Sequence, residues 1–212
     1  MLLYELVEGI NAMRGSQILE GLADERQAID KNKNVYMNYI KNHKENVIKA
    51  YNEYMIPLMN RTPNQELKEA ILKAGKNVQY HDLSKYEPVE FEAYRRHFYP
   101  TDFEKADPKF DEVTKVLYDV AWKHHHENNE HHPEHWGLDK NPPEDMPLEF
   151  IIEMFCDWIA MDMYYKGSPR EWWESEKTQK DEATYMTTKT KEWVNTILYD
   201  LLPDISFKEE SK

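Results

Sequence analysis

Apolar side chains recur every three or four residues along most of this chain, which is the spacing of one face of an α-helix. Between residues 34 and 56 one such stripe contains Val35, Tyr39, His43, Val47 and Tyr51. A second stripe follows Thr62-Pro63 and contains Leu67, Ala70, Ile71, Ala74 and Val78. We therefore predict two helices, the second ending near His81-Asp82, with a break between them at Pro57 and Pro63.

The same spacing predicts further helices downstream. In 109–127 the stripe of Phe110, Val113, Leu117 and Val120 should face the core, with histidines at its C-terminal end. Pro147 should begin a strongly apolar helix that contains Asp157. Shorter or weaker helices are expected at 16–30, at 90–97 and, amphipathic, from 171 to 202. Residues 128–147 read as a loop, and one of this length inside a compact domain is often functional.

Composition narrows the class of protein. The chain has 212 residues, a length that suits one domain, and its 6 glycines disfavour an all-β fold. A net charge of -13 argues against duplex nucleic acid as a partner. The single cysteine, Cys156, cannot form an internal disulfide, and no apolar run reaches membrane-spanning length. With no signal-peptide pattern either, we expect a cytoplasmic, all-α protein without a membrane partner; its oligomeric state stays open.

Several polar side chains interrupt these apolar stripes. His43 lies within one stripe, His81-Asp82 ends another, and Asp157 is set inside the most apolar helix. Burying a lone carboxylate costs several kcal/mol unless something compensates it, and a shared divalent metal would satisfy several ligands together. Helix bundles build such sites from facing helices. Imidazole and carboxylate ligands suit one or two ions of manganese, iron, zinc, cobalt or nickel.

The order of these residues resembles a known superfamily. His43, then His81-Asp82, then Asp157 on a later helix, is similar to the H…HD…D signature of the HD-domain metal-dependent phosphohydrolases. The run from His81 to Lys85 resembles the HDxxK variant of that signature. The resemblance covers about residues 35–165. It implies one HD-domain-like helical bundle over 1–212, with a long His-rich loop and N- and C-terminal helical extensions.

Two further resemblances concern the histidine-rich region. His124-His125-His126-Glu127 is similar to the HH-E element of subgroups with two or three metals, including the HD-GYP phosphodiesterases. The loop that follows lacks their Gly-Tyr-Pro motif, which disfavours a cyclic dinucleotide substrate. With its His131-His132-Pro133 run, the loop also looks like that of a bacterial and phage family that carries an H-H-P motif.

The superfamily resemblance implies a role for each residue. His43, His81, Asp82 and Asp157 would hold the first ion, and Asp82 could bridge to a second. The second site would be completed by residues from two groups: His124 or His125, and His131 or His132. Adjacent helical positions diverge by about 100°, so His124, His125 and His126 should not all face one ion.

The implied reaction is hydrolysis of a nucleotide or another small phosphate ester by metal-activated water. Lys85 would neutralise phosphate oxygens, with Arg95, Arg96 or Lys123 as further candidates. Glu127 would orient water or a ligating imidazole. Two alternatives remain open: a diiron oxygenase on the same scaffold, and a non-catalytic, metal-stabilised binding protein that a phage could encode.

Each residue also has a purely structural interpretation. His43 could be a satisfied core histidine, and His81 could favour a helix C-terminus. Asp157 could cap a neighbouring helix. The 124–135 segment could be a solvated loop with incidental metal affinity. Spatial convergence of His43, His81-Asp82 and Asp157 would separate the metal-site hypothesis from all of these.

Overall fold

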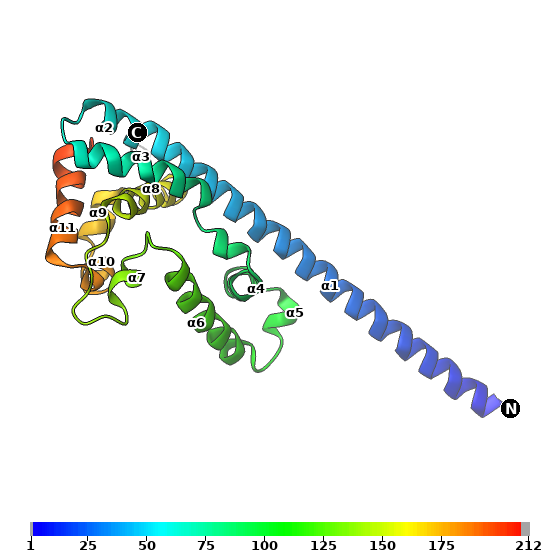
Figure 1. Cartoon of the computed structure of the whole chain (residues 1–212). Coiled ribbons are helices and arrows are strands. Elements are labelled where there is room, and N and C mark those ends of the chain that lie inside the picture. Colours follow the sequence, from blue (N-terminus) through cyan, green and yellow to red (C-terminus); the bar gives the residue numbers. More distant parts are fainter. Residues whose placement is uncertain (1, 209–212) are drawn as a thin grey trace.

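A computed structural model describes the backbone of residues 2–208 and the side chains of residue 17 and residues 19–208. The described part is mostly helical and contains no strand, which confirms the all-α prediction (Figure 1). The α-helices are α1 (Leu2–Ala50), α2 (Ile56–Arg61), α3 (Gln65–Tyr80), α4 (Pro88–Phe98), α5 (Asp102–Lys105), α6 (Phe110–Asn128), α7 (Pro133–Gly137), α8 (Leu148–Tyr165), α9 (Pro169–Glu174), α10 (Glu176–Lys180) and α11 (Thr188–Asn195). The shorter helical turns are η1 (Tyr51–Met55), η2 (Leu83–Tyr86), η3 (Glu182–Tyr185) and η4 (Thr196–Leu201).

The first helical unit is longer than expected. The predicted helix 16–30 lies within α1, and the predicted helix 34–56 covers the end of α1, the π-helical turn η1 and the first residue of α2. The prediction of a break at Pro57 was therefore wrong: the chain leaves the helix only at Thr62. Pro57 has no N–H to donate, and a π turn just before it accommodates the lost bond. Asn64 then caps α3 by accepting a hydrogen bond from the Leu67 N–H.

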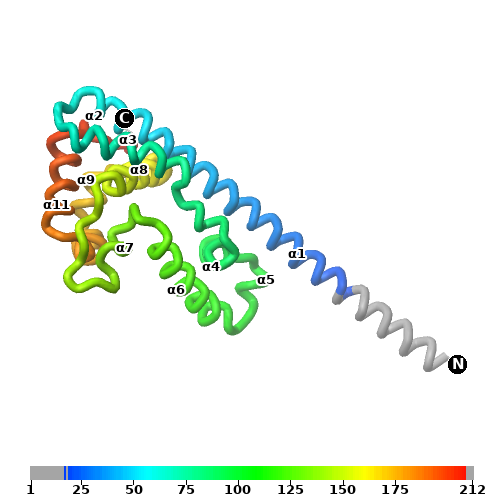
Figure 2. Tube along the Cα trace, viewed as in Figure 1, coloured from blue at the N-terminus to red at the C-terminus, as the bar shows by residue number. Residues whose placement is uncertain are grey.

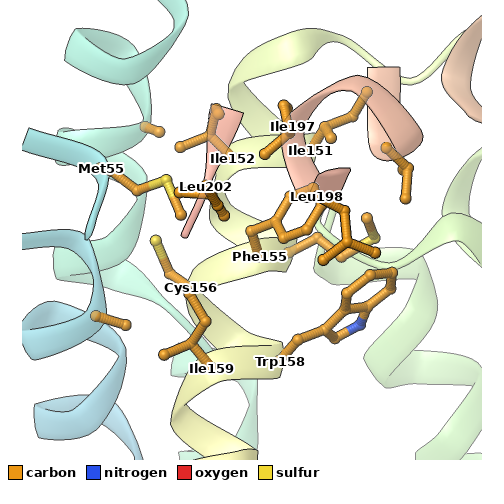
Figure 3. Close-up of a cluster of buried hydrophobic side chains, with 14 of the residues drawn as sticks. Met55, Ile151, Ile152, Phe155, Cys156, Trp158, Ile159, Ile197, Leu198 and Leu202 are labelled. Carbon is orange, nitrogen blue, oxygen red and sulfur yellow. The ribbon is translucent and has the colours of Figure 1, made fainter. Parts of the chain in front are cut away.

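Helix α8 runs through the centre of the main core. Helices α1 and α3 both pack against α8, and α11 and η4 cover it from the C-terminal side. Figure 3 shows Phe155 of α8 near Ile151 of the same helix and Leu198 of η4. The apolar face of α8 is so wide because helices surround it on several sides.

Helices α4 and α6 form a separate pair beneath the middle of α1 (Figure 1). Their small core contains Tyr36, Ile40, Ala93, Tyr94 and Ala121. The apolar stripe of α6 was predicted to face the protein core. It instead lies at the surface, where Val113, Leu117 and Val120 are exposed. That prediction was wrong because α6 turns Thr114, Ala121 and His125 inward against α4.

The segment between α6 and α8 is more ordered than the loop that we predicted. It contains the short helix α7, and Figure 2 shows it turning between α6 and the C-terminal helices. Gly137 is needed here, because a Cβ atom would lie 2.3 Å from the Tyr185 carbonyl oxygen. Within the described residues, no helix is both long and apolar enough to cross a membrane.

The central position of α8 leads to a stability prediction. Phe155→Ala should lower the free energy of unfolding by about 3–5 kcal/mol, because Phe155 is fully buried and its removal leaves a cavity. Val116→Ala on the exposed face of α6 is the control and should change stability by less than about 0.5 kcal/mol. Urea denaturation followed by circular dichroism measures both. Equal effects of the two variants would contradict this packing.

Candidate metal centre

Three separate parts of the chain bring four polar side chains to one point. His43 comes from α1, His81-Asp82 from the turn between α3 and η2, and Asp157 from α8. His43 Nε2 lies 3.3 Å from His81 Nε2 and 3.0 Å from Asp157 Oδ1. Asp82 Oδ2 lies 3.7 Å from His43 Nε2 and 3.4 Å from His81 Nε2. His43, His81 and Asp82 lie close enough together to hold one cation, and Asp157 lies beside them and also forms a group with His131 and His132.

Asp82, which faces both halves of this site, has an unusual backbone conformation. Asp82 adopts the left-handed conformation with φ 57° and follows directly after the end of α3. Only glycine, asparagine and aspartate adopt this conformation without a large steric cost. The turn buries the Asp82 carboxylate and places its two oxygen atoms toward different sets of histidines.

The Glu153 carboxylate determines which ring nitrogen of His81 faces the other candidate ligands. His81 Nδ1 lies 3.0 Å from Glu153 Oε1, so Nδ1–H donates to the carboxylate and the lone pair of the neutral ring is on Nε2. Nε2 is the atom that faces His43, Asp82 and Asp157. A carboxylate partner of this kind is typical of metal-binding histidines, because it fixes the ring and raises its basicity.

The other oxygen of Asp82 faces a second group of histidines. Asp82 Oδ1 lies 3.5 Å from His125 Nε2 and 3.7 Å from His131 Nε2, while His125 Nε2 lies 3.0 Å from His132 Nε2. Glu90 accepts from Nδ1–H of His125, which leaves the lone pair of the neutral ring on Nε2. Asp82 Oδ1 and His131 Nε2 are buried and have no hydrogen-bond partner. Buried orphan groups of this kind fit an ion between Asp82, His125 and His132.

His126 belongs to a neighbouring group. Its Nδ1–H donates to the Trp122 carbonyl oxygen, and its Nε2 lies 3.6 Å from Glu134 Oε2, a buried atom without a hydrogen-bond partner. Burial raises the pKa of Glu134 to about 7 and lowers that of His126 to about 4. His126, His132 and Glu134 could also hold an ion. His132 is common to both histidine-rich groups.

The charges inside the site depend on one another. Burial alone would raise the pKa of Asp82, but His81, Lys85 and His125 outweigh it and hold this pKa well below its usual range. Burial likewise opposes ionisation of Asp157, and His43 and His81 lower its pKa. Burial disfavours a charge on His81, yet the surrounding carboxylates raise its pKa well above normal. The cluster therefore attracts positive charge, and a bound cation would displace the proton from His81.

Two of the predicted site residues are not part of these groups. His124 points away from Asp82: its Nδ1 lies 2.7 Å from Glu90 Oε1 and its Nε2 3.5 Å from Glu87 Oε2. Glu127 is exposed and lies 3.6 Å from Lys123, so it orients neither a ligand nor water. The reason is the helical phase: only His125 and His126 of this run are on the buried face of α6.

The structure also distinguishes among the lysine and arginine side chains that were predicted to neutralise phosphate. Lys85 Nζ lies 2.5 Å from Asp82 Oδ2 and is largely buried beside the first group. Arg95 instead forms a buried bidentate pair with Glu104, and Arg96 donates to the same carboxylate. Both arginines therefore serve the α4–α5 corner. Lys85 is the one candidate that lies at the centre.

Sequence reasoning missed the supporting carboxylates. Glu153 also lies 3.4 Å from His131 Nδ1, so one residue supports imidazoles from two segments. A signal was present: Glu153 precedes Asp157 by four positions in the same apolar helix, which places both on one face. Glu90 supports both His124 and His125. It gave no comparable signal, because α4 is rich in charged residues.

Two large cavities adjoin the candidate metal centre, besides a smaller one of about 200 Å³ that His43 lines. One has a volume of about 540 Å³, and Lys85, His125 and His126 lie in its wall together with eight aromatic residues, Tyr36, Tyr39, Tyr94, Phe98, Tyr99, Tyr118, Trp122 and Tyr165. The other has a volume of about 390 Å³ and includes His131, His132 and Asp157. Met161 and Tyr165 line both cavities. Small molecules therefore have space on two sides of the cluster.

Comparison with known proteins gives one match. A model described as a family of unknown function, DUF5662, matches residues 32–200. The chain belongs to this family. The DUF5662 segment contains every residue of the candidate metal centre, from His43 to Asp157, and leaves out the first 30 residues of α1. No curated protein and no solved structure matches the chain.

The bridging position of Asp82 leads to a metal-binding prediction. Asp82→Asn keeps the side-chain size and tolerates the left-handed backbone, but it removes the charge shared by both groups. Its bound metal, measured by elemental analysis after loading with manganese and desalting, should fall by at least about tenfold. Circular dichroism should show unchanged helicity. Glu127→Gln is the exposed control and should retain the metal. An Asp82→Asn protein with full metal content would refute the site.

A second prediction concerns Glu153. Glu153→Gln should weaken metal binding by about 10- to 100-fold, because it weakens the hydrogen bonds that orient His81 and His131. Competition with a fluorescent chelator measures this affinity. Glu149→Gln, on the same helix but partly exposed beside Lys73, is the matched control. If both variants bind metal equally well, Glu153 has no supporting role.

Proposed function

We propose that this protein is a metal-dependent phosphohydrolase of the HD type that acts on a small phosphate ester or a nucleotide. The observation that carries the proposal is the convergence of His43, His81, Asp82 and Asp157 from three separate elements. These are the residues on which the sequence resemblance to HD-domain enzymes rests. The cavities beside the cluster add space for a substrate next to the ligand atoms.

A divalent cation held here would supply a water of lowered pKa and would polarise a phosphoryl oxygen. The protein residues have distinct tasks around it. Glu153 and Glu90 orient His81 and His125, so that each Nε2 faces Asp82. Lys85 lies in the wall of the larger cavity, where its ammonium group can neutralise phosphate oxygens. Burial opposes the charge of Lys85, but Asp82 and Asp157 raise its pKa, so it stays protonated.

The larger cavity could accept the base of a nucleotide. Its tyrosines give flat surfaces on which a purine or pyrimidine can stack. Burial raises the pKa of Tyr39 and Tyr94, so their phenol groups remain neutral beside a phosphorylated ligand. This cavity supports the nucleotide option within the proposed substrate class.

The second histidine group favours one alternative, a diiron oxygenase. Asp82 faces two sets of nitrogen ligands through its two oxygen atoms, which is suited to a pair of ions. Iron content close to two per chain, with an iron-dependent visible absorption and no phosphatase activity, would support this function instead. A fully coordinated ion without any turnover would favour a structural metal in a binding protein.

The decisive test is hydrolysis by the purified full-length chain. Phosphate release from a panel of nucleotides and simple phosphate monoesters should require added manganese or cobalt and should disappear with a chelator. Asp82→Asn should abolish it. Absence of phosphate release from the whole panel, in protein that binds metal, would contradict the proposal.

Lys85 gives a separate prediction. Lys85→Met retains the length of the side chain but removes its charge, so it should lower kcat/KM by about 100-fold while changing bound metal by less than about twofold. Phosphate release and elemental analysis measure the two effects. Lys123→Met, exposed on α6, is the control. Equal loss of metal and activity in Lys85→Met would assign Lys85 to the ion site instead.

A further inference from the structure

The smaller of the two large cavities has an unusual combination of groups. Its wall contains the carboxyl groups of Asp157, Asp162 and Glu182 and the rings of Trp158, Tyr165 and Trp172. Among the described residues no lysine or arginine lines it, although Lys177 Nζ lies 5.6 Å from the centre of the Trp172 ring. Aromatic rings next to carboxylates are suited to an organic cation, because the ring faces and the anions both attract it.

Besides His131 Nε2, two atoms of lining residues lack partners. Asp162 Oδ2 and Trp172 Nε1 are both buried and neither makes a hydrogen bond in the described part of the chain. Buried polar atoms are normally satisfied, so an acceptor and a donor left free beside one cavity indicate a ligand with both kinds of group. Asp162 can accept from an ammonium group, and Trp172 can donate to a nearby oxygen.

The backbone holds Asp162 in this position. Gly167 packs so close that a Cβ atom there would lie 2.2 Å from Asp162 Oδ1. The carboxyl group is therefore wedged against the end of α8, with its other oxygen buried and unpaired. Burial, reinforced by Glu171, raises the pKa of Asp162 to about 6, and burial raises that of Glu182 to about 8. A cationic ligand would favour the ionised form of both carboxyl groups.

Asp157 connects this cavity to the metal centre. The same carboxylate lies 3.0 Å from His43 and also lines the cavity. A phosphate monoester bound at the centre can therefore extend its organic part between the tryptophans. The volume of about 390 Å³ suits a group of a few heavy atoms. The additional phosphates of a nucleoside di- or triphosphate would meet three carboxyl groups there.

We propose that the smaller cavity binds the amine-bearing leaving group of a small phosphate monoester, an amino alcohol phosphate. This inference rests on the proposed phosphohydrolase function and narrows its substrate class. Hydrolysis would form a phosphorus–oxygen bond from water and break the ester bond. The proton released by the attacking water would end on the oxygen of the departing amino alcohol, whose ammonium group stays with Asp162 and Glu182.

The test compares esters that differ in charge but little in size. Manganese-loaded full-length protein is assayed with O-phosphoethanolamine, propyl phosphate and AMP. We expect kcat/KM for O-phosphoethanolamine to exceed that for propyl phosphate by at least about tenfold, which corresponds to one good charged contact. In Asp162→Asn this ratio should fall toward one, mainly through a higher KM for O-phosphoethanolamine. Asp200→Asn, exposed on η4, should leave the ratio unchanged.

A binding experiment separates the two proposals. Titration of ethanolamine into metal-free protein should change the tryptophan fluorescence, and the change should weaken in both Asp162→Asn and Trp172→Phe. If no ester is hydrolysed but ethanolamine binds with this dependence, the phosphohydrolase proposal fails and the amine site stands. The amine site is overturned if kcat/KM for propyl phosphate or AMP equals that for O-phosphoethanolamine. It is also overturned if the ratio of kcat/KM values for O-phosphoethanolamine and propyl phosphate is unchanged in Asp162→Asn.

Discussion

The structure depends on the burial of acidic groups that the chain cannot neutralise by itself. Asp82 and Asp157 lie inside a helical body, and both face the same two imidazoles, His43 and His81. Lys85 supplies one positive charge. Removing carboxylates from water costs several kcal/mol each. A cation bound among these groups would resolve this conflict, and the same carboxylates would hold it in place.

The helices around the cluster explain how so polar a centre persists. The ligands come from long helices and a fixed turn whose other faces pack in an apolar core around α8. That core gives the body stability independent of an ion, so the site can be open to ligands without threatening the fold. The α4–α6 pair adds His125 with its partner Glu90, and the α7 segment adds His131 and His132. The two histidine groups meet at Asp82, which makes this residue the link between both halves.

Sequence reasoning was most successful where the signal is local. Helical spacing predicted α3, α4, α6 and α8 to within a few residues, because their apolar positions repeat at the helical period. It also selected the four residues that converge at the first group. It was wrong about Pro57, since a π turn can absorb a missing N–H, and about the exposed stripe of α6, since apolar spacing identifies a face but does not say which neighbour covers it. His124 and Glu127 followed from motif resemblance, and the phase of α6 excludes both from the metal centre.

The sequence by itself determined the helical class, the positions of α3, α4, α6 and α8, and the set of residue types that could bind a metal, since each follows from the order of side chains along one segment. Only the tertiary structure decided which nitrogen of each imidazole faces the centre, that Glu153 supports both His81 and His131, and that Asp162 and Trp172 share a cavity wall. Those facts depend on how residues distant in the chain pack against each other. Periodicity within one helix carries no information about its partners.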